Sequence, residues 1–274
     1  MPASALLLAL GAAGLHAFWN VLLAGARDTD AATAVMLLVS IVLFAPIAAF
    51  TWRVEWEAAP YIAGSSAFEL AYFALLARAY RRSELSLVYP LARGIAPVLV
   101  LAVSVLALAV ATSALEAGGV VLVGIGVMLV RGLRRPADSR GVAFAIAIGA
   151  CIAAYTLLDK EGIAHAGAIP YLELVTVGPA IAYGVAMLAR KGAPALRAEL
   201  RPRTIVAALA LFGAYALVLV ALGLAPAAPV AAVRESSVLL ATLLAVLVLK
   251  ERVSPARAGG AALIVAGIVL VGLS

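Results

Sequence analysis

The chain has 274 residues, of which 66% are hydrophobic and 12% are charged, and its formal net charge at pH 7 is +6. These proportions exclude an ordinary soluble domain. The basic residues lie in short connections between long apolar runs, which is typical of membrane orientation and does not indicate nucleic-acid binding. Because lipid cannot satisfy open backbone groups, we predict an all-α polytopic membrane protein.

The apolar runs predict ten transmembrane helices, each near the roughly 20 residues that cross a bilayer. In chain order they cover residues 4–24, 31–52, 58–79, 86–110, 114–131, 141–159, 168–190, 203–225, 228–249 and 255–273. The first run has no basic residues before it, so a cleaved signal peptide is not expected. The single cysteine, Cys151, excludes a disulfide within the chain.

The two halves of the chain share a pattern of residues. At the spacing that relates Arg93 to Arg234, Ser113 corresponds to Ser254, and two Gly-Gly pairs and a further glycine also fall into register. A polar connection separates residues 1–131 from residues 141–274, with five predicted helices on each side. Because five is an odd number, the halves would face opposite ways across the membrane. The sequence therefore predicts two inverted five-helix repeats, a plan found in many secondary transporters.

Charge predicts the orientation of the helices. Nearly all Lys and Arg residues outside the predicted spans follow odd-numbered helices, and the exceptions are Arg53 and Lys160. By the positive-inside rule, the basic connections are cytoplasmic, which places both termini outside.

Charged side chains within the spans are candidate functional residues, because a charge in lipid is costly unless it faces a polar cavity or a partner. Arg93 and Arg234 could hold a carboxylate or phosphonate group, or they could reach the interface or pair with an acid. Glu69, near the middle of the third predicted helix, is interpreted as the counter-ion of Arg93 or as a proton-coupling acid. Glu235 could be engaged in a local salt bridge with the adjacent Arg234.

Polar and aromatic side chains complete the predicted site. His16 could shuttle protons or donate to a substrate, or it could be a packed histidine, and Trp19 and Asn20 lie beside it. Tyrosines could line the same cavity, although tyrosine also occurs at membrane interfaces. They are Tyr72, Tyr89, Tyr155 and Tyr215.

The motifs of common enzymes and metal sites do not occur in the sequence. It contains no GxxxxGK[ST], HExxH or GxSxG pattern. Two histidines and one cysteine, far apart, do not predict a metal site. We therefore expect no catalytic activity, no cofactor and no metal.

Three segments carry a resemblance to a known family. They are Leu15-His16-Ala17-Phe18-Trp19-Asn20, Tyr89-Pro90-Leu91-Ala92-Arg93-Gly94 and Lys250-Glu251-Arg252-Val253-Ser254-Pro255. Together they resemble the EamA family of the drug/metabolite transporter superfamily, and the resemblance covers the whole chain. It implies ten helices in two inverted repeats and the export of amino acids or other small metabolites. It also implies cytoplasmic termini, opposite to the charge pattern.

The sequence and the resemblance together predict a secondary transporter of the cytoplasmic (inner) membrane. We expect it to export small organic metabolites, such as amino acids, through a cavity between its halves, as a monomer or a homodimer. The substrate gradient or protons bound by Glu69, Glu235 or His16 would supply the energy. One alternative is uptake or exchange of an organic anion held by the two arginines. The other is a membrane scaffold or lipid-processing protein that does not transport.

Overall fold

The computed structural model describes residues 1–82, 85–131, 139–240, 243 and 254–274. These residues form ten α-helices, one 3-10 helix and no β-strand. The helices are α1 (Ala3–Ala24), α2 (Thr29–Phe50), η1 (Trp56–Ala58), α3 (Ala59–Arg82), α4 (Leu85–Leu106), α5 (Ala114–Arg131), α6 (Ser139–Gly162), α7 (Ala168–Glu199), α8 (Pro202–Leu224), α9 (Ala227–Arg234) and α11 (Pro255–Leu273).

Six of these helices are long and apolar enough to cross a membrane, namely α1, α2, α6, α7, α8 and α11. Shorter apolar helical stretches cover Pro90–Leu106 of α4 and Ala114–Val130 of α5. The all-helical membrane class is therefore confirmed.

Most predicted spans match the observed helices closely, and the predictions for residues 86–110 and 228–249 were wrong. The former helix ends at Leu106, and Ala109 beyond it has a φ of 52°, which no α-helix accommodates. The latter breaks after Arg234, and residues 241–242 and 244–253 lie outside the described part of the chain.

Several helices begin at a side chain that caps them. The Asp28 carboxylate accepts backbone N–H groups from Asp30 and Ala31, each at 3.1 Å, at the start of α2. Ser113 and Ser254, which correspond in the predicted repeat, cap α5 and α11 by accepting a backbone N–H three residues later, at 3.1 Å and 3.3 Å. The two serines that correspond in the sequence thus have the same local role, capping a helix, in both halves.

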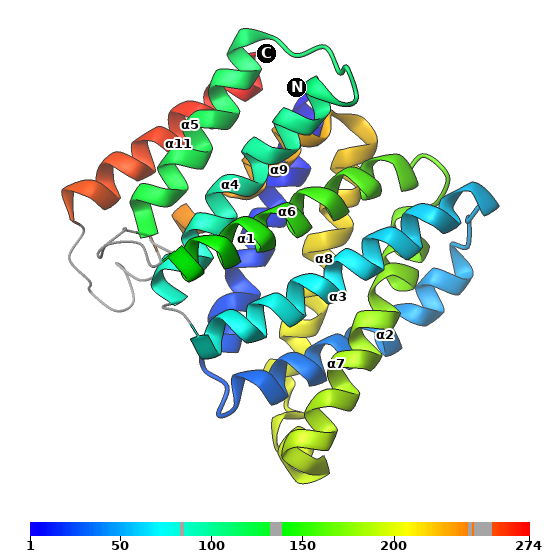
Figure 1. Cartoon of the computed structure of the whole chain (residues 1–274). Coiled ribbons are helices and arrows are strands. Elements are labelled where there is room, and N and C mark those ends of the chain that lie inside the picture. Colours follow the sequence, from blue (N-terminus) through cyan, green and yellow to red (C-terminus); the bar gives the residue numbers. More distant parts are fainter. Residues whose placement is uncertain (83–84, 132–138, 241–242, 244–253) are drawn as a thin grey trace.

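The connections alternate between two ends of the bundle. The turns that join α1 to α2 and α7 to α8 lie together and line one cavity; we call this the basic end, because Arg201 and Arg203 lie there. The connections after α2 and α6 meet at the opposite end, through an isolated antiparallel β-bridge between Val54 and Ala166. Figure 1 shows the N and C labels close together, and Gly272 of α11 faces Leu6 of α1.

The helices pack in pairs that exchange when the halves are exchanged. α1 packs along α8 and α3 along α6, while α2 packs along α7 and α5 along α11 (Figure 1). Suppose that α6, α7, α8, α9 and α11 correspond to α1, α2, α3, α4 and α5. Exchanging the halves then turns the α1–α8 pair into the α6–α3 pair, and it leaves the α2–α7 and α5–α11 pairs unchanged. A repeat has this property, and the inverted repeat of residues 1–131 and 141–274 stays a prediction.

Glycines allow α5 and α11 to cross at backbone distance. A Cβ added at Gly119 would lie 2.7 Å from the carbonyl oxygen of Gly267, and one at Gly126 would lie 2.7 Å from that of Gly260. A side chain at any of these positions would force the helices apart. Gly119, Gly126, Gly260 and Gly267 therefore serve the close packing of the two helices.

Candidate functional site

Six helices surround a central cavity of about 140 Å³ that contains most of the predicted site residues. The cavity lies between α1, α3, α4, α6, α8 and α9. Its polar and aromatic lining is formed by His16, Trp19, Glu69, Tyr72, Phe73, Arg93, Tyr155, Tyr215 and Arg234. Alanine, leucine and valine side chains of α1 and α8 complete the wall. Residues that are far apart in the sequence thus form one polar chamber within an apolar bundle.

Two arginines share one acid beside this cavity. Nε of Arg93 lies 3.0 Å from Oε2 of Glu235, and Nε of Arg234 lies 3.9 Å from Oε1 of the same carboxylate. The side chains of Arg93, Arg234 and Glu235 are 8%, 7% and 1% exposed. The structure corrects the expectation that Glu69 is the counter-ion of Arg93, because Glu235 occupies that place.

Glu235 reaches Arg93 because the helix is interrupted at this residue. The backbone N–H of Glu235 bonds to the carbonyl of Ala232, and that of Ser236 to Val233, each at 3.0 Å, so the last turn is tightened to 3-10 spacing. The helical conformation resumes at Ser237. Within the described residues, neither carboxylate oxygen of Glu235 accepts a hydrogen bond, so the arginines are what compensate this buried charge.

His16 lies on the other side of the Arg93 guanidinium. Nη2 of Arg93 is 3.3 Å from Nε2 of His16. Because a guanidinium only donates, the imidazole accepts at Nε2 and is neutral in this arrangement. Asn20 donates to the backbone carbonyl of His16 at 2.7 Å, so its amide is used within α1, and it does not line the cavity.

Trp19 brings an unused donor to the site. Its ring packs edge-on against His16 with the centroids 4.9 Å apart. Within the part of the chain that the structure describes, the indole Nε1 is buried and has no hydrogen-bond partner. A buried indole N–H usually has an acceptor, so this group is available to a ligand in the cavity.

Glu69 and three of the four predicted tyrosines line the cavity. No ion pair of Glu69 is formed among the described residues, although its carboxylate lies in the same chamber as the two guanidinium groups. The rings of Tyr155 and Tyr215 lie 6.3 Å apart, and the ring of Tyr72, on α3, packs edge-on against that of Phe73 with the centroids 5.2 Å apart. Tyr89 belongs to α4, and its side chain is outside the described part of the structure.

A buried carboxylate that is not among the predicted site residues, Asp159, belongs to the same region. Asp159 is 1% exposed and accepts hydrogen bonds from Ser65, Tyr171 and Tyr215 at 2.6, 3.0 and 2.6 Å. Its spacing of four residues from Tyr155 puts both on one face of α6, and that spacing is the signal that could have identified it.

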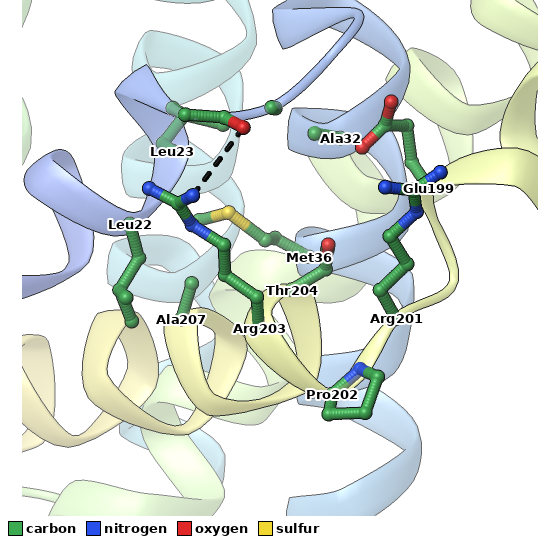
Figure 2. Close-up of a pocket in the computed structure, with 12 residues that line it drawn as sticks. Leu22, Leu23, Ala32, Met36, Glu199, Arg201, Pro202, Arg203, Thr204 and Ala207 are labelled. Carbon is green, nitrogen blue, oxygen red and sulfur yellow. Dashed lines mark hydrogen bonds between the residues drawn. The ribbon is translucent and has the colours of Figure 1, made fainter.

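A second cavity of about 370 Å³ opens at the basic end (Figure 2). Arg203 crosses it and donates to the carbonyl oxygens of Val21, at 2.9 Å, and Gly25, at 3.4 Å. We call this the outer cavity. Between it and the central cavity lies an apolar cluster that contributes lining residues to both, formed by Trp19, Leu22, Leu23, Met36, Val39, Ala207, Ala208 and Leu211.

Comparisons with known proteins agree with this architecture. Residues 139–273 match the model of the EamA-like transporter family. A solved crystal structure superposes with a TM-score of 0.76 at 16% sequence identity, covering 100% of this chain and 99% of that chain, and this likeness concerns the fold alone. No curated protein matches the sequence. The second half of the chain, residues 139–273, belongs to the EamA-like transporter family, whose members are membrane transporters, and the long apolar helices are those of a multi-pass membrane protein.

Proposed function

We propose that this protein is a secondary transporter that exports small organic metabolites carrying a carboxylate, such as amino acids, across the cytoplasmic membrane. The central cavity is the substrate site. Its volume of about 140 Å³ suits a small metabolite better than a drug-sized molecule. In this proposal Arg93 and Arg234 bind the anionic group of the substrate, as suggested from the sequence.

The observation that carries this proposal is the charge balance around Glu235. Two guanidinium groups lie within 4 Å of a single carboxylate, at 3.0 and 3.9 Å. Within this contact the guanidinium groups outnumber the carboxylate, and a guanidinium can bind the carboxylate of a substrate through two parallel hydrogen bonds. The indole N–H of Trp19, which has no partner among the described residues, and the tyrosine hydroxyl groups supply further polar contacts.

The outer cavity supports a route to this site from the basic end. The apolar cluster around Met36 contributes lining residues to both cavities, so a movement of its side chains would join them. A substrate would enter the outer cavity and pass between Trp19 and Leu211 when the cluster opens. If the basic end is cytoplasmic, as the charge pattern predicts, this route is the loading step of export.

The same charge balance favours exchange of organic anions as the second candidate function. An exporter would move labelled substrate out without a counter-substrate, whereas an exchanger requires anions on both sides. Net efflux and counterflow in one set of proteoliposomes separate these two modes.

The test begins with a thermal-stability screen of purified protein against amino acids, nucleosides, phosphonates and cationic drugs. The amino acid that stabilises most is then used in flux measurements on Arg93→Lys and on a matched control, Arg53→Lys, in which the arginine is exposed at the opposite end. An ammonium keeps the charge but loses the planar fork, so we expect affinity to fall about 10- to 150-fold in Arg93→Lys only. Normal affinity in well-folded Arg93→Lys and Arg93→Gln variants would show that this arginine does not bind the substrate.

A further inference from the structure

Asp159 is buried where four helices meet. Oδ1 accepts from the Ser65 hydroxyl of α3 at 2.6 Å and from the Tyr171 hydroxyl of α7 at 3.0 Å, and Oδ2 accepts from the Tyr215 hydroxyl of α8 at 2.6 Å. Asp159 itself belongs to α6 and is 1% exposed. Among the described residues it forms no salt bridge, so neutral hydroxyl groups replace water around the carboxylate.

Tyr215 connects this carboxylate to the substrate cavity. Its ring lines the central cavity while its hydroxyl is bonded to Asp159. The ionisable groups that interact electrostatically with Asp159 are Glu69 of α3, Arg234 of α9, Tyr155 of its own helix, and the two bonded tyrosines. The charge on Asp159 therefore acts on groups that line the cavity, and the Tyr215 side chain links a ligand in the cavity to Asp159.

Backbone hydrogen bonds tie two connections of the bundle together at this end. The connections after α2 and α6 are tied by Gly167 N–H to the Arg53 carbonyl at 2.7 Å and Glu55 N–H to the His165 carbonyl at 2.9 Å. Tyr171 is fully buried beneath them. A further cavity of about 280 Å³ opens at this end and is lined by Lys160 and Glu161, which follow Asp159 directly in α6.

We infer that Asp159 is a proton-binding site that couples proton movement to transport. The inference rests on the proposed transport function. One proton from solution binds to Oδ2 of Asp159, and the resulting O–H group donates a hydrogen bond to the Tyr215 oxygen. The Tyr215 hydroxyl keeps its own hydrogen, which turns away from Asp159 and points into the cavity. Oδ1 keeps its two donors, but the bonds now end on a neutral acid. Because charge-assisted hydrogen bonds are about twice as strong as neutral ones, protonation loosens the attachment of α6 to α3 and α7.

The decisive variant is Asp159→Asn, which keeps the shape and removes the titration, with Glu161→Gln, an exposed acid near the end of the same helix, as the control. Proteoliposomes are loaded with the amino acid identified by the screen. We expect Asp159→Asn to exchange substrate at equal pH and to lose accumulation driven by a pH gradient, whereas Glu161→Gln does both. Gradient-driven accumulation that persists in Asp159→Asn overturns the inference.

A second variant covers the case in which Asp159→Asn loses exchange as well. Tyr215→Phe keeps the carboxyl group and removes a donor worth about 1.5–3 kcal/mol to the charged form. The pH midpoint of accumulation should then move upward by about 1–2 units. An unchanged midpoint overturns the inference.

Infrared difference spectra separate failure of the inference from failure of the proposed function, because they need no transport. As the pH falls, the wild type should gain a protonated-carboxyl band that Asp159→Asn lacks and Glu161→Gln retains. If the band appears but the wild type moves none of the screened compounds, the transport proposal fails and the proton site stands. If the wild type transports and the two spectra are identical, the proton site is refuted.

Discussion

Replacing Glu235 with Gln should destabilise the protein more than replacing either arginine that it contacts. At 3.0 Å and an effective dielectric constant of about 20, the attraction between Glu235 and Arg93 is about 5 kcal/mol, and that to Arg234 at 3.9 Å is about 4 kcal/mol. Glu235→Gln removes the carboxylate that both buried guanidinium groups face at these distances, and breaking a buried pair in this way costs about 3–5 kcal/mol. Arg93→Gln leaves Glu235 with Arg234, so a smaller loss of about 1–3 kcal/mol is expected.

The free energies of unfolding can be compared by denaturant titration in detergent micelles, with helical circular dichroism as the signal. The double variant Arg93→Gln/Glu235→Gln should be less destabilised than the sum of the single variants, because the two residues interact directly. Glu161→Gln, at an exposed acid, should stay within about 0.5 kcal/mol of the wild type. If Glu235→Gln is as stable as the wild type, or less affected than Arg93→Gln, the shared-acid interpretation is wrong.

Three further predictions concern packing, orientation and pH. Gly267→Ala should lower the free energy of unfolding by about 1–3 kcal/mol, because the added Cβ would meet the backbone of α5. Gly259→Ala should not, because nothing lies within 4 Å of a Cβ at that position, and equal effects would contradict the close crossing. In a Cys151→Ala background, a cysteine at Ser139 should resist an impermeant reagent in intact cells, and strong labelling would place the preceding connection outside. Contact with Lys191 holds the pKa of the Asp28 carboxyl below its usual range, so Asp28→Asn, which keeps the cap, should lower stability at neutral pH. This loss of stability should vanish as the pH falls through the lowered pKa. A loss that does not change with pH would exclude the ion pair as its origin.

Hydropathy predicted the helices well because burial in lipid requires long apolar segments that carry their own backbone hydrogen bonds. It did not predict the break at Glu235, since the residues before it remain apolar and a tightened turn leaves no trace in hydropathy. The end of α4 at Leu106 was missed for a similar reason, because Val110 and its neighbours are as apolar as the helix itself. Positions where the backbone departs from an apolar helix are therefore the least predictable from composition.

The candidate site was predicted residue by residue but not in its pairing. A charged residue within a long apolar segment is easily recognised in a sequence, so Arg93, Arg234 and Glu69 could be named in advance. Which acid faces Arg93 depends on the turn after α9 and on how α4 and α9 pack, and neither has a local signal. Asp159 was undervalued because its three partners come from α3, α7 and α8, which only the folded bundle brings together.

The glycine crossing of α5 and α11 also bears on the order in which the protein is assembled. α6, α7, α8 and α9 are all synthesised between these two helices, so the crossing cannot form until the ribosome has completed α11. Until then, the backbone of α5 at Gly119 and Gly126 has no helix to cover it at that face. The contact that brings α5 and α11 to backbone distance is therefore among the last to form during insertion, and in a chain that stops before α11 the glycine face of α5 stays uncovered.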